Sequence, residues 1–326
     1  MNNTRQNIIA YLGSQGQVTA NELVNYLNIS RQALFKHHLS KMINDGVLVK
    51  NGRPPKVFYS LNKLDKKIAA EILIDKNTKN ILSENYLIIT PAGEKKEGVD
   101  GFIYWCEKQG LPVVKTAEEY LKTLRKYQQF KKDGLINGLP KIKKTFSKVS
   151  LDGVFYLDFY SIERIGKTRM GQLLLYAKQS QDKKLMKEII DEIKPKIRKV
   201  IKKFKIDGIG FIPPTVKRET QLMKVLEKGL SGDLRKVKIA KIRTTVAVPQ
   251  KTLNKLEDRI ENAQNTIVVE ENSSFKNILL IDDAVGSGAT LNEVAKKIKT
   301  KKICKGKVFG LALTGSFKGF DVISEV

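Results

Sequence analysis

The segment IDDAVGSGAT covers residues 281–290 and follows the apolar run 278–280. The apolar residues predict a buried strand that delivers two acids, and the small residues after them predict a tight turn. A helix is expected to begin at Thr290. Glycines allow a backbone to approach a ligand closely, and a helix N-terminus adds positive potential. The turn is therefore predicted to bind a phosphate group.

The two acids of this segment, Asp282 and Asp283, narrow the choice of ligand. An ionised carboxylate only accepts hydrogen bonds, so sugar hydroxyls or Mg²⁺ are its expected partners. The segment lacks the Gly-Lys-Ser/Thr ending of nucleoside-triphosphatase loops and the GxGxxG spacing of dinucleotide sites. These residues predict a phosphorylated sugar as the ligand, and the alternative is a strand-to-helix turn that binds nothing.

The C-terminal half of the chain alternates between apolar strands and amphipathic helices. This alternation predicts an α/β fold with a mostly parallel twisted sheet flanked by helices, and ligands of such sheets bind at the carboxyl ends of the strands. The expected strands are 154–159, 208–212, 237–242, 277–281 and 308–313, and the expected helices are 170–177, 185–204, 218–230 and 290–298.

A second candidate ligand loop follows the expected strand 208–212. It begins with Pro213, Pro214 and Thr215 and continues to Lys217 and Arg218. An ammonium acts as a point charge and a guanidinium as a two-pronged donor, so both are suited to a diphosphate. The alternative is that Lys217 and Arg218 are the exposed start of a basic helix.

Two acids followed by a small, hydroxyl-bearing turn resemble the signature of type I phosphoribosyltransferases, which bind 5-phosphoribosyl-1-pyrophosphate (PRPP). The resemblance implies that Asp282 and Asp283 hold the ribose hydroxyls. That family often has threonine at the first two turn positions, where this chain has Gly286 and Ser287, so one hydroxyl is lost. The implied 5′-phosphate turn consists of Val285, Gly286, Ser287, Gly288, Ala289 and Thr290.

Two further segments resemble the ComF-like branch of that family over about residues 151–315. Residues 213–218 resemble its pyrophosphate loop. Arg243, Thr245, Gln250 and Arg259 resemble its mobile loop and following helix, although the spacing from Thr245 to Gln250 is longer here. The zinc ribbon that usually precedes this domain is absent.

This resemblance implies a reaction scheme in which Mg²⁺ bridges the diphosphate and the ribose hydroxyls of PRPP. Asp282 and Asp283 are the implied metal contacts, directly or through water. Both acids would also steady the electron-poor ribose, while Lys217 and Arg218 neutralise the departing pyrophosphate. No general base is evident, and the acceptor of the phosphoribosyl group is not specified by any motif.

Residues 1–62 read as three short helices followed by a basic hairpin. Thr19 with Glu22 forms a capping-box pattern, Ser30 is the expected cap of the third helix, and Leu23, Tyr26 and Leu27 are expected to face inward. This order resembles the winged-helix domains of bacterial regulators, and the alternative is a protein-docking or dimerisation module. The implied DNA contacts are Arg31, Gln32, Lys36, His37, Lys50, Arg53 and Lys56.

The middle of the chain carries no chemical motif. We expect a charged linker helix over residues 63–84 and an intermediate α/β segment over 85–150, before a PRPP-binding domain over 151–326. Within the intermediate segment we expect a strand at 87–89, a loop at 93–100 and a helix at 117–130. The aromatic residues Phe102, Tyr104 and Trp105 are expected to form part of a core.

The chain has 326 residues, a formal net charge of +26 and an isoelectric point near 9.8. Such an excess predicts polyanionic or phosphorylated partners, although a general preference for lysine is the alternative explanation. The two cysteines, without a CxxC spacing, do not favour a disulfide framework or a zinc site. No signal-peptide pattern and no apolar run of membrane-spanning length is found, so a cytoplasmic location is expected.

Three functions fit these motifs. The chain is either a phosphoribosyltransferase that carries a winged helix for double-stranded DNA, or a regulator that senses PRPP or a nucleotide without turnover. A weaker alternative is a nucleic-acid-bound effector of a defence or toxin-like system. Retention of both Lys217 and Arg218 favours the enzyme. A homodimer is expected only because proteins of both classes commonly form one.

Overall fold

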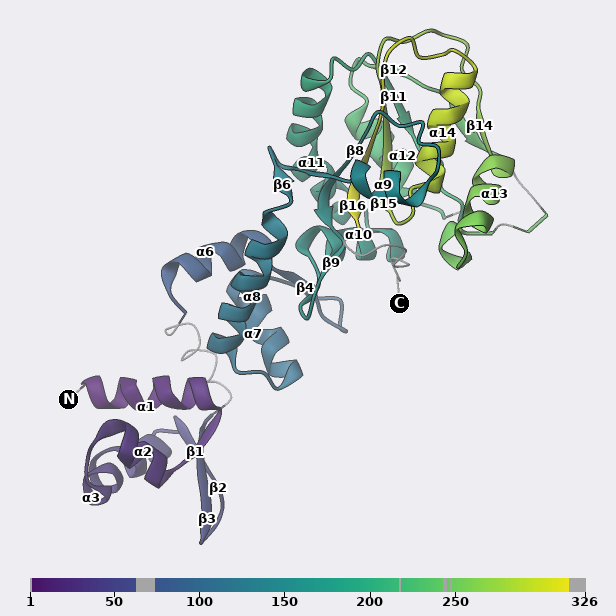
Figure 1. Cartoon of the computed structure of the whole chain (residues 1–326). Coiled ribbons are helices and arrows are strands. Elements are labelled where there is room, and N and C mark those ends of the chain that lie inside the picture. Colours follow the sequence, from purple (N-terminus) through teal and green to yellow (C-terminus); the bar gives the residue numbers. More distant parts are fainter. Residues whose placement is uncertain (1, 63–73, 217, 243–244, 247, 317–326) are drawn as a thin grey trace. The chain divides into compact units, whose positions relative to one another are not determined.

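The computed structural model describes residues 2–62, 74–216, 218–242, 245–246 and 248–316 (Figure 1). Contacts divide the chain into two compact units, Met1–Arg125 and Lys126–Val326, which are described separately below. Within these described ranges, no helix is long and apolar enough to cross a membrane.

The N-terminal part of the first unit combines helices with a small antiparallel sheet. The sheet has the order β1-β3-β2, and its first strand, β1, was not predicted from the sequence. Its strands are β1 (Gln17–Thr19), β2 (Leu48–Arg53) and β3 (Lys56–Leu61), and the helices are α1 (Asn2–Gln15), α2 (Ala20–Leu27), α3 (Arg31–Ala33), the π-helical turn η1 (Leu34–Leu39) and α4 (Ser40–Asn44).

Capping side chains set the starts of these helices, as the sequence predicted. The backbone N–H of Thr19 donates to the Glu22 carboxylate at 2.6 Å, and the N–H of Glu22 donates back to the Thr19 hydroxyl at 3.3 Å. The Ser30 hydroxyl accepts the N–H of Ala33 at 3.2 Å. Leu23 is fully buried, but the prediction for Tyr26 is wrong, because its ring is 50% exposed and stacks on Tyr11.

The remainder of the first unit packs three helices around a hairpin. The predicted loop at 93–100 is wrong, because residues 95–97 form a strand that pairs antiparallel with residues 87–89. The elements are α6 (Lys76–Asn85), β4 (Leu87–Ile89), β5 (Lys95–Glu97), α7 (Gly98–Gln109) and α8 (Val113–Gln128), within which the boundary between the two units falls.

The prediction of one unbroken linker helix from residue 63 to residue 84 is also wrong. Asp75 has extended backbone angles and caps α6 by accepting the N–H of Thr78 at 3.0 Å, so a helix starts only after it. Residues 63–73 lie outside the described part of the chain.

An aromatic cluster forms the core of this region. Phe102 packs edge-on against Tyr86, with ring centroids 5.1 Å apart, and also contacts Trp105 and Tyr120. Tyr104 was expected in this core, but its ring lies near the ammonium groups of Lys96 and Lys108, which are 5.7 and 5.9 Å from the ring centroid. Most of the expected aromatic core is therefore confirmed.

The second unit is built on a seven-stranded, mostly parallel sheet with the order β12-β11-β15-β16-β8-β7-β6. The five strands from β12 to β8 are parallel, and the β6–β7 hairpin continues the sheet antiparallel to β8. The strands are β6 (Lys131–Lys132), β7 (Leu135–Asn137), β8 (Gly153–Phe159), β11 (Gly208–Phe211), β12 (Arg235–Lys236), β15 (Ile278–Val285) and β16 (Val308–Gly315).

Helices flank this sheet, which confirms the predicted α/β class (Figure 1). The connection through α12 and the connection through α14 run in opposite directions along the sheet, so right-handed crossovers place these helices on opposite faces. The helices are α9 (Leu139–Thr145), α10 (Arg169–Gln179), α11 (Lys183–Lys203), α12 (Leu222–Leu230), α13 (Leu256–Thr266) and α14 (Ala289–Thr300).

Three predicted boundaries in this unit are wrong for identifiable reasons. The strand expected to end at Ile281 continues to Val285, because Ala284 and Val285 still pair with β16. The helix expected from Arg218 begins at Leu222, because Gln221 has extended backbone angles and its side chain donates to the carbonyl of Val216.

The third wrong boundary concerns the expected strand 237–242. Residues 239–241 form strand β13 (Ile239–Lys241), which leaves the main sheet and pairs antiparallel with β14 (Ile267–Val269). The edge strand of the main sheet is β12, just before it. A further two-stranded sheet joins β9 (Ser161–Ile162) to β10 (Gly166–Lys167).

Candidate functional site

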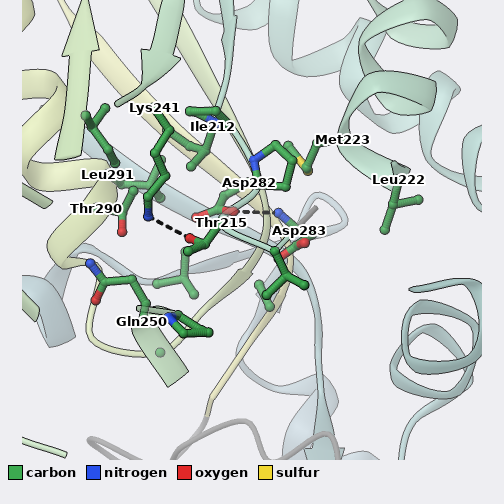
Figure 2. Close-up of a pocket in the computed structure, with 18 of the residues that line it drawn as sticks. Ile212, Thr215, Leu222, Met223, Lys241, Gln250, Asp282, Asp283, Thr290 and Leu291 are labelled. Atoms are coloured by element: carbon green, nitrogen blue, oxygen red, sulfur yellow. Dashed lines mark hydrogen bonds between the residues drawn. The ribbon is translucent and has the colours of Figure 1, made fainter. Parts of the chain in front are cut away.

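The neighbouring strands β11 and β15 form a topological switch point of the sheet. From β11 the chain proceeds to β12 on one side, and from β15 it proceeds to β16 on the other. The loops after these two strands therefore diverge and leave a crevice at their carboxyl ends, which is where open α/β sheets bind ligands. A pocket of about 230 Å³ lies there, lined by residues 212–216 and 282–291 among others (Figure 2).

The predicted acids lie in the carboxyl-terminal half of β15 and line this pocket (Figure 2). The N–H of Asp283 donates to the Asp282 carboxylate at 2.9 Å. The Asp283 carboxylate forms an ion pair of 2.9 Å with the Nζ atom of Lys178 in α10, and both side chains are less than 20% exposed. Lys178 was not predicted as a site residue, because only the packing of α10 brings it to the acids.

The pKa of Asp282 is set by its burial and by the charged groups beside it. Burial raises the pKa of Asp282 to about 8, and the negative charge of Asp283 adds to the shift. The hydrogen bond from the Asp283 N–H and the charge of Lys178 act in the opposite direction. A ligand that needs an ionised Asp282 must therefore displace a proton near neutral pH, or bring a cation with it.

The predicted phosphate turn lines the same pocket from Val285 to Thr290. Gly288 has a φ of +82°, and α14 begins directly after it at Ala289. The N–H of Ala289 donates to the Ser287 hydroxyl at 3.3 Å. The turn therefore places a helix N-terminus at the pocket, one residue earlier than predicted.

The loop after β11 faces this turn across the pocket. Pro213, Pro214, Thr215 and Arg218 all line it, as predicted, whereas Lys217 lies outside the described residues. Because α12 starts only at Leu222, Arg218 belongs to the loop and not to a helix.

Lys241 is a pocket residue that the sequence did not reveal. It projects from β13 and donates from Nζ to the Thr215 hydroxyl at 2.6 Å (Figure 2). Burial lowers the pKa of its ammonium group. A half-buried ammonium group of this kind attracts an anion, since the pocket rather than bulk water must stabilise its charge. Its only sequence signal was a lysine within an apolar strand.

The predicted mobile-loop residues divide into two groups. Gln250 and Arg259 line the pocket, but Arg259 is 5% exposed and donates from Nε to the Leu253 carbonyl at 2.7 Å. Gln250 donates to the carbonyl of Arg259 at 3.0 Å, so these two side chains hold the loop against α13. Thr245 is exposed and is not among the described lining residues, and Arg243 lies outside the described part.

Asp282 and Asp283 are the two pocket side chains that could hold a Mg²⁺ ion. In the described ranges, no group of three or more His, Cys, Asp and Glu side chains is placed to hold a metal. Mg²⁺ commonly binds through one or two carboxylates together with substrate phosphates and water. Asp282 and Asp283 supply two carboxylates, although the carboxylate of Asp283 already forms an ion pair with Lys178.

The first unit presents a separate set of predicted contacts. All seven side chains predicted to touch DNA are exposed, on the third helical stretch and on the β2–β3 hairpin. Arg31 lies over the ring of Phe35, with its guanidinium carbon 5.9 Å from the centroid. The seven residues are Arg31, Gln32, Lys36, His37, Lys50, Arg53 and Lys56.

Comparison of the sequence with protein-family models gives no match, and no curated protein matches it.

The phosphate turn should be intolerant of a side chain at Gly288. A Cβ atom there would lie 2.3 Å from the Cδ1 atom of Ile142, in a left-handed backbone conformation. We expect Gly288→Ala to cost about 2–4 kcal/mol of unfolding free energy, from backbone strain and overpacking together. Gly232→Ala, also left-handed but with open space around it, should cost only about 1–2 kcal/mol.

A double-mutant cycle with Ile142→Val, which removes the clashing methyl group, separates the two contributions in denaturant unfolding. Part of the loss at Gly288 should be recovered in the double variant. If the free-energy changes of the two single variants simply add in the double variant, Ile142 does not constrain the turn.

Because the pKa of Asp282 is raised in the folded state, the stability of the protein is predicted to depend on pH. Between its unfolded and folded pKa values the folded state binds more protons than the unfolded state, so stability falls as pH rises towards about 8. Asp282→Asn removes the charge, and its stability gain over the parent protein should grow between pH 5 and pH 8.5 by at least about 1.4 kcal/mol. Thermal melts at several pH values measure this difference in stability.

The control is the exposed Asp233→Asn, whose stability relative to the parent protein should not change with pH. A pH-independent gain for Asp282→Asn would disprove the burial argument.

Proposed function

We propose that the pocket of the second unit binds PRPP and that the chain transfers its phosphoribosyl group to an acceptor, releasing pyrophosphate. The observation that carries this proposal is the meeting of two different loops at one switch point, one with a glycine turn before a helix and the other with Arg218. The glycine turn with its helix N-terminus suits a 5′-phosphate. The loop after β11 with Arg218, together with Lys241 of β13, suits a diphosphate, and Asp282 and Asp283 line the same pocket with acceptors for ribose hydroxyls.

In this proposal, different side chains of the pocket stabilise the positive and the negative charge that develop during the reaction. The bond between C1 and the diphosphate oxygen breaks, and the acceptor forms a new bond to C1. Positive charge that develops on the ribose ring is stabilised by the carboxylates of Asp282 and Asp283. Negative charge on the leaving pyrophosphate is neutralised by Arg218 and Lys241, and Lys217 is expected to contribute. Bound Mg²⁺ would neutralise further phosphate charge.

The sheet supports assignment to the type I phosphoribosyltransferase fold. Its parallel strands carry the two loops in the chain order that the resemblance implies, with the pyrophosphate loop before the acids. The antiparallel pair β13 and β14 lies between them in sequence, and β13 contributes Lys241 to the pocket. The ComF-like branch remains the proposed relationship, on the residues around Gln250 and Arg259.

The first unit is proposed to be a winged helix that binds double-stranded DNA. Support comes from three helical stretches followed by the antiparallel hairpin β2–β3, whose tip carries Arg53 and Lys56. The third helical stretch exposes Arg31 and Gln32, which can read base edges, and Lys36, which can contact phosphate. A π-helical turn within it, at Leu34–Leu39, alters the direction of its exposed face.

A second candidate is a PRPP sensor without turnover. The observation in its favour is the pairing of Asp283 with Lys178 together with the raised pKa of Asp282, which reduces the negative charge available to a developing cation. A sensor requires that PRPP affinity differ between the DNA-bound and free states, by the same factor in both directions.

The enzyme is tested by incubating the full chain with PRPP, Mg²⁺ and a panel of acceptors and following pyrophosphate release. Asp282→Asn with Asp283→Asn should reduce release roughly 10²-fold or more, because it removes preorganised charge stabilisation. The control is Asp233→Asn, an exposed acid outside the pocket lining. No release with any acceptor, combined with PRPP-dependent DNA affinity, would favour the sensor.

The DNA proposal is tested by duplex binding at several salt concentrations. Arg31→Ala with Lys36→Ala should weaken binding and reduce the slope of log affinity against log salt by roughly 1, since Lys36 is the expected phosphate contact and each such contact contributes about 0.9. Lys115→Ala with Lys122→Ala removes two exposed charges from α8 and should leave the slope unchanged. An equal effect of both variants would show that the third helical stretch has no special role.

A further inference from the structure

The amino ends of the parallel strands carry a concentration of lysines that the proposed reaction does not use. Residues 194–205 contain seven basic residues and no acid, and residues 296–307 again contain seven and no acid. By contrast, residues 250–275 contain three basic and five acidic residues. A uniform preference for lysine does not explain this distribution.

Tertiary contacts bring these separated segments to one end of the sheet. The side chain of Asn277, just before β15, donates to the carbonyls of Phe204 and Lys205, after α11. Its oxygen accepts the N–H of Lys307, just before β16, at 2.9 Å. Asn277 therefore ties together the ends of α11 and of the α14–β16 loop, at the top of the second unit in Figure 1.

Six exposed lysines of these segments make up what we call the amino-end basic surface. In the described part of the chain, none of them forms an ion pair. The nearby acids are already used, because Asp207 accepts backbone N–H groups and pairs with Arg235, and Asp152 pairs with Lys299. The six are Lys202, Lys205, Lys276, Lys302, Lys305 and Lys307.

We infer that the amino-end basic surface binds the phosphate backbone of a nucleic-acid duplex. Six uncompensated ammonium groups complement a regularly spaced polyanion and release its counterions on binding. This surface is a second nucleic-acid contact, distinct from the exposed residues of the first unit. It also does not depend on the ligand proposed for the pocket.

A duplex fits better than a single strand or a lipid surface. Single-strand binding relies on exposed aromatic rings, but here Phe275 is buried beneath Arg235 and Phe204 packs on Phe309. Membrane binding relies on apolar side chains that enter the bilayer. Among the described residues, the large exposed apolar side chains all lie outside residues 194–205 and 274–307.

The surface and the pocket can be occupied together. All five parallel strands place their amino ends at this surface and their carboxyl ends towards the pocket. The eight residues of β15 separate the two ends by about 26 Å, at about 3.3 Å of rise per residue. Bound duplex would therefore leave the pocket open to PRPP and to an acceptor.

The test uses the full chain carrying Arg31→Ala and Lys36→Ala, so that the first unit contributes less. Into this background we introduce Lys276→Gln, Lys305→Gln and Lys307→Gln, whose side chains are exposed and whose structural hydrogen bonds use only backbone groups. The matched control carries Lys183→Gln, Lys184→Gln and Lys187→Gln, exposed lysines at the start of α11. Affinity for a DNA duplex, an RNA duplex, a single strand and anionic vesicles is measured from 50 to 200 mM salt.

For duplexes, we expect the slope of log affinity against log salt to be smaller by roughly 2–3 in the test variant, because three phosphate contacts are lost. The slope of the control should not change. Unchanged duplex binding would overturn the inference, as would equal losses in test and control. A loss confined to vesicles or to the single strand would also overturn it. Unchanged melting temperatures and unchanged PRPP binding by the test variant would show that the pocket and fold are intact.

Discussion

The parallel pairing of β11 with β15 is the constraint on which the rest of the second unit depends. The two strands pair from Gly208 with Ile278 to Phe211 with Ile281, and the ladder continues to the N–H of Ile212. Glycine is required in β11 because a Cβ at Gly208 would lie 2.4 Å from the ring of Phe275, and one at Gly210 would lie 2.8 Å from Ile239. The pairing of Phe211 with Ile281 starts the loop after β11 beside Asp282, while β15 continues to Val285 before the glycine turn begins.

The pocket that results concentrates charge of both signs in a small volume. Burial, together with the strong repulsion between two adjacent carboxylates, raises the pKa of Asp282, and the ion pair from Lys178 to Asp283 moderates this repulsion. Arg218 lies on the loop after β11, and Lys241 of β13 donates a hydrogen bond to Thr215 of that loop. A ligand with a hydroxyl-rich centre and anionic groups at both ends complements this arrangement, and PRPP has that distribution of groups.

The parallel sheet also gives its two ends different surroundings. At the carboxyl ends, glycine turns and a helix N-terminus expose backbone donors towards the pocket. At the amino ends, helices finish and loops turn, and here exposed lysines accumulate. If both ends bind as proposed, nucleic acid and PRPP would occupy opposite ends of one rigid sheet. Such a protein could act on a small molecule while held on a duplex.

Elements with local signals were predictable from the amino-acid sequence. The apolar run before Asp282, the glycine turn to Thr290 and the caps at Thr19 and Ser30 each depend on residues within a few positions, and the structure confirms them. The extent of β15, the departure of β13 from the main sheet and the placement of Lys178 and Lys241 in the pocket became evident from the packed fold. Their pairing and packing partners lie at least 26 residues away along the chain, beyond the reach of any local pattern.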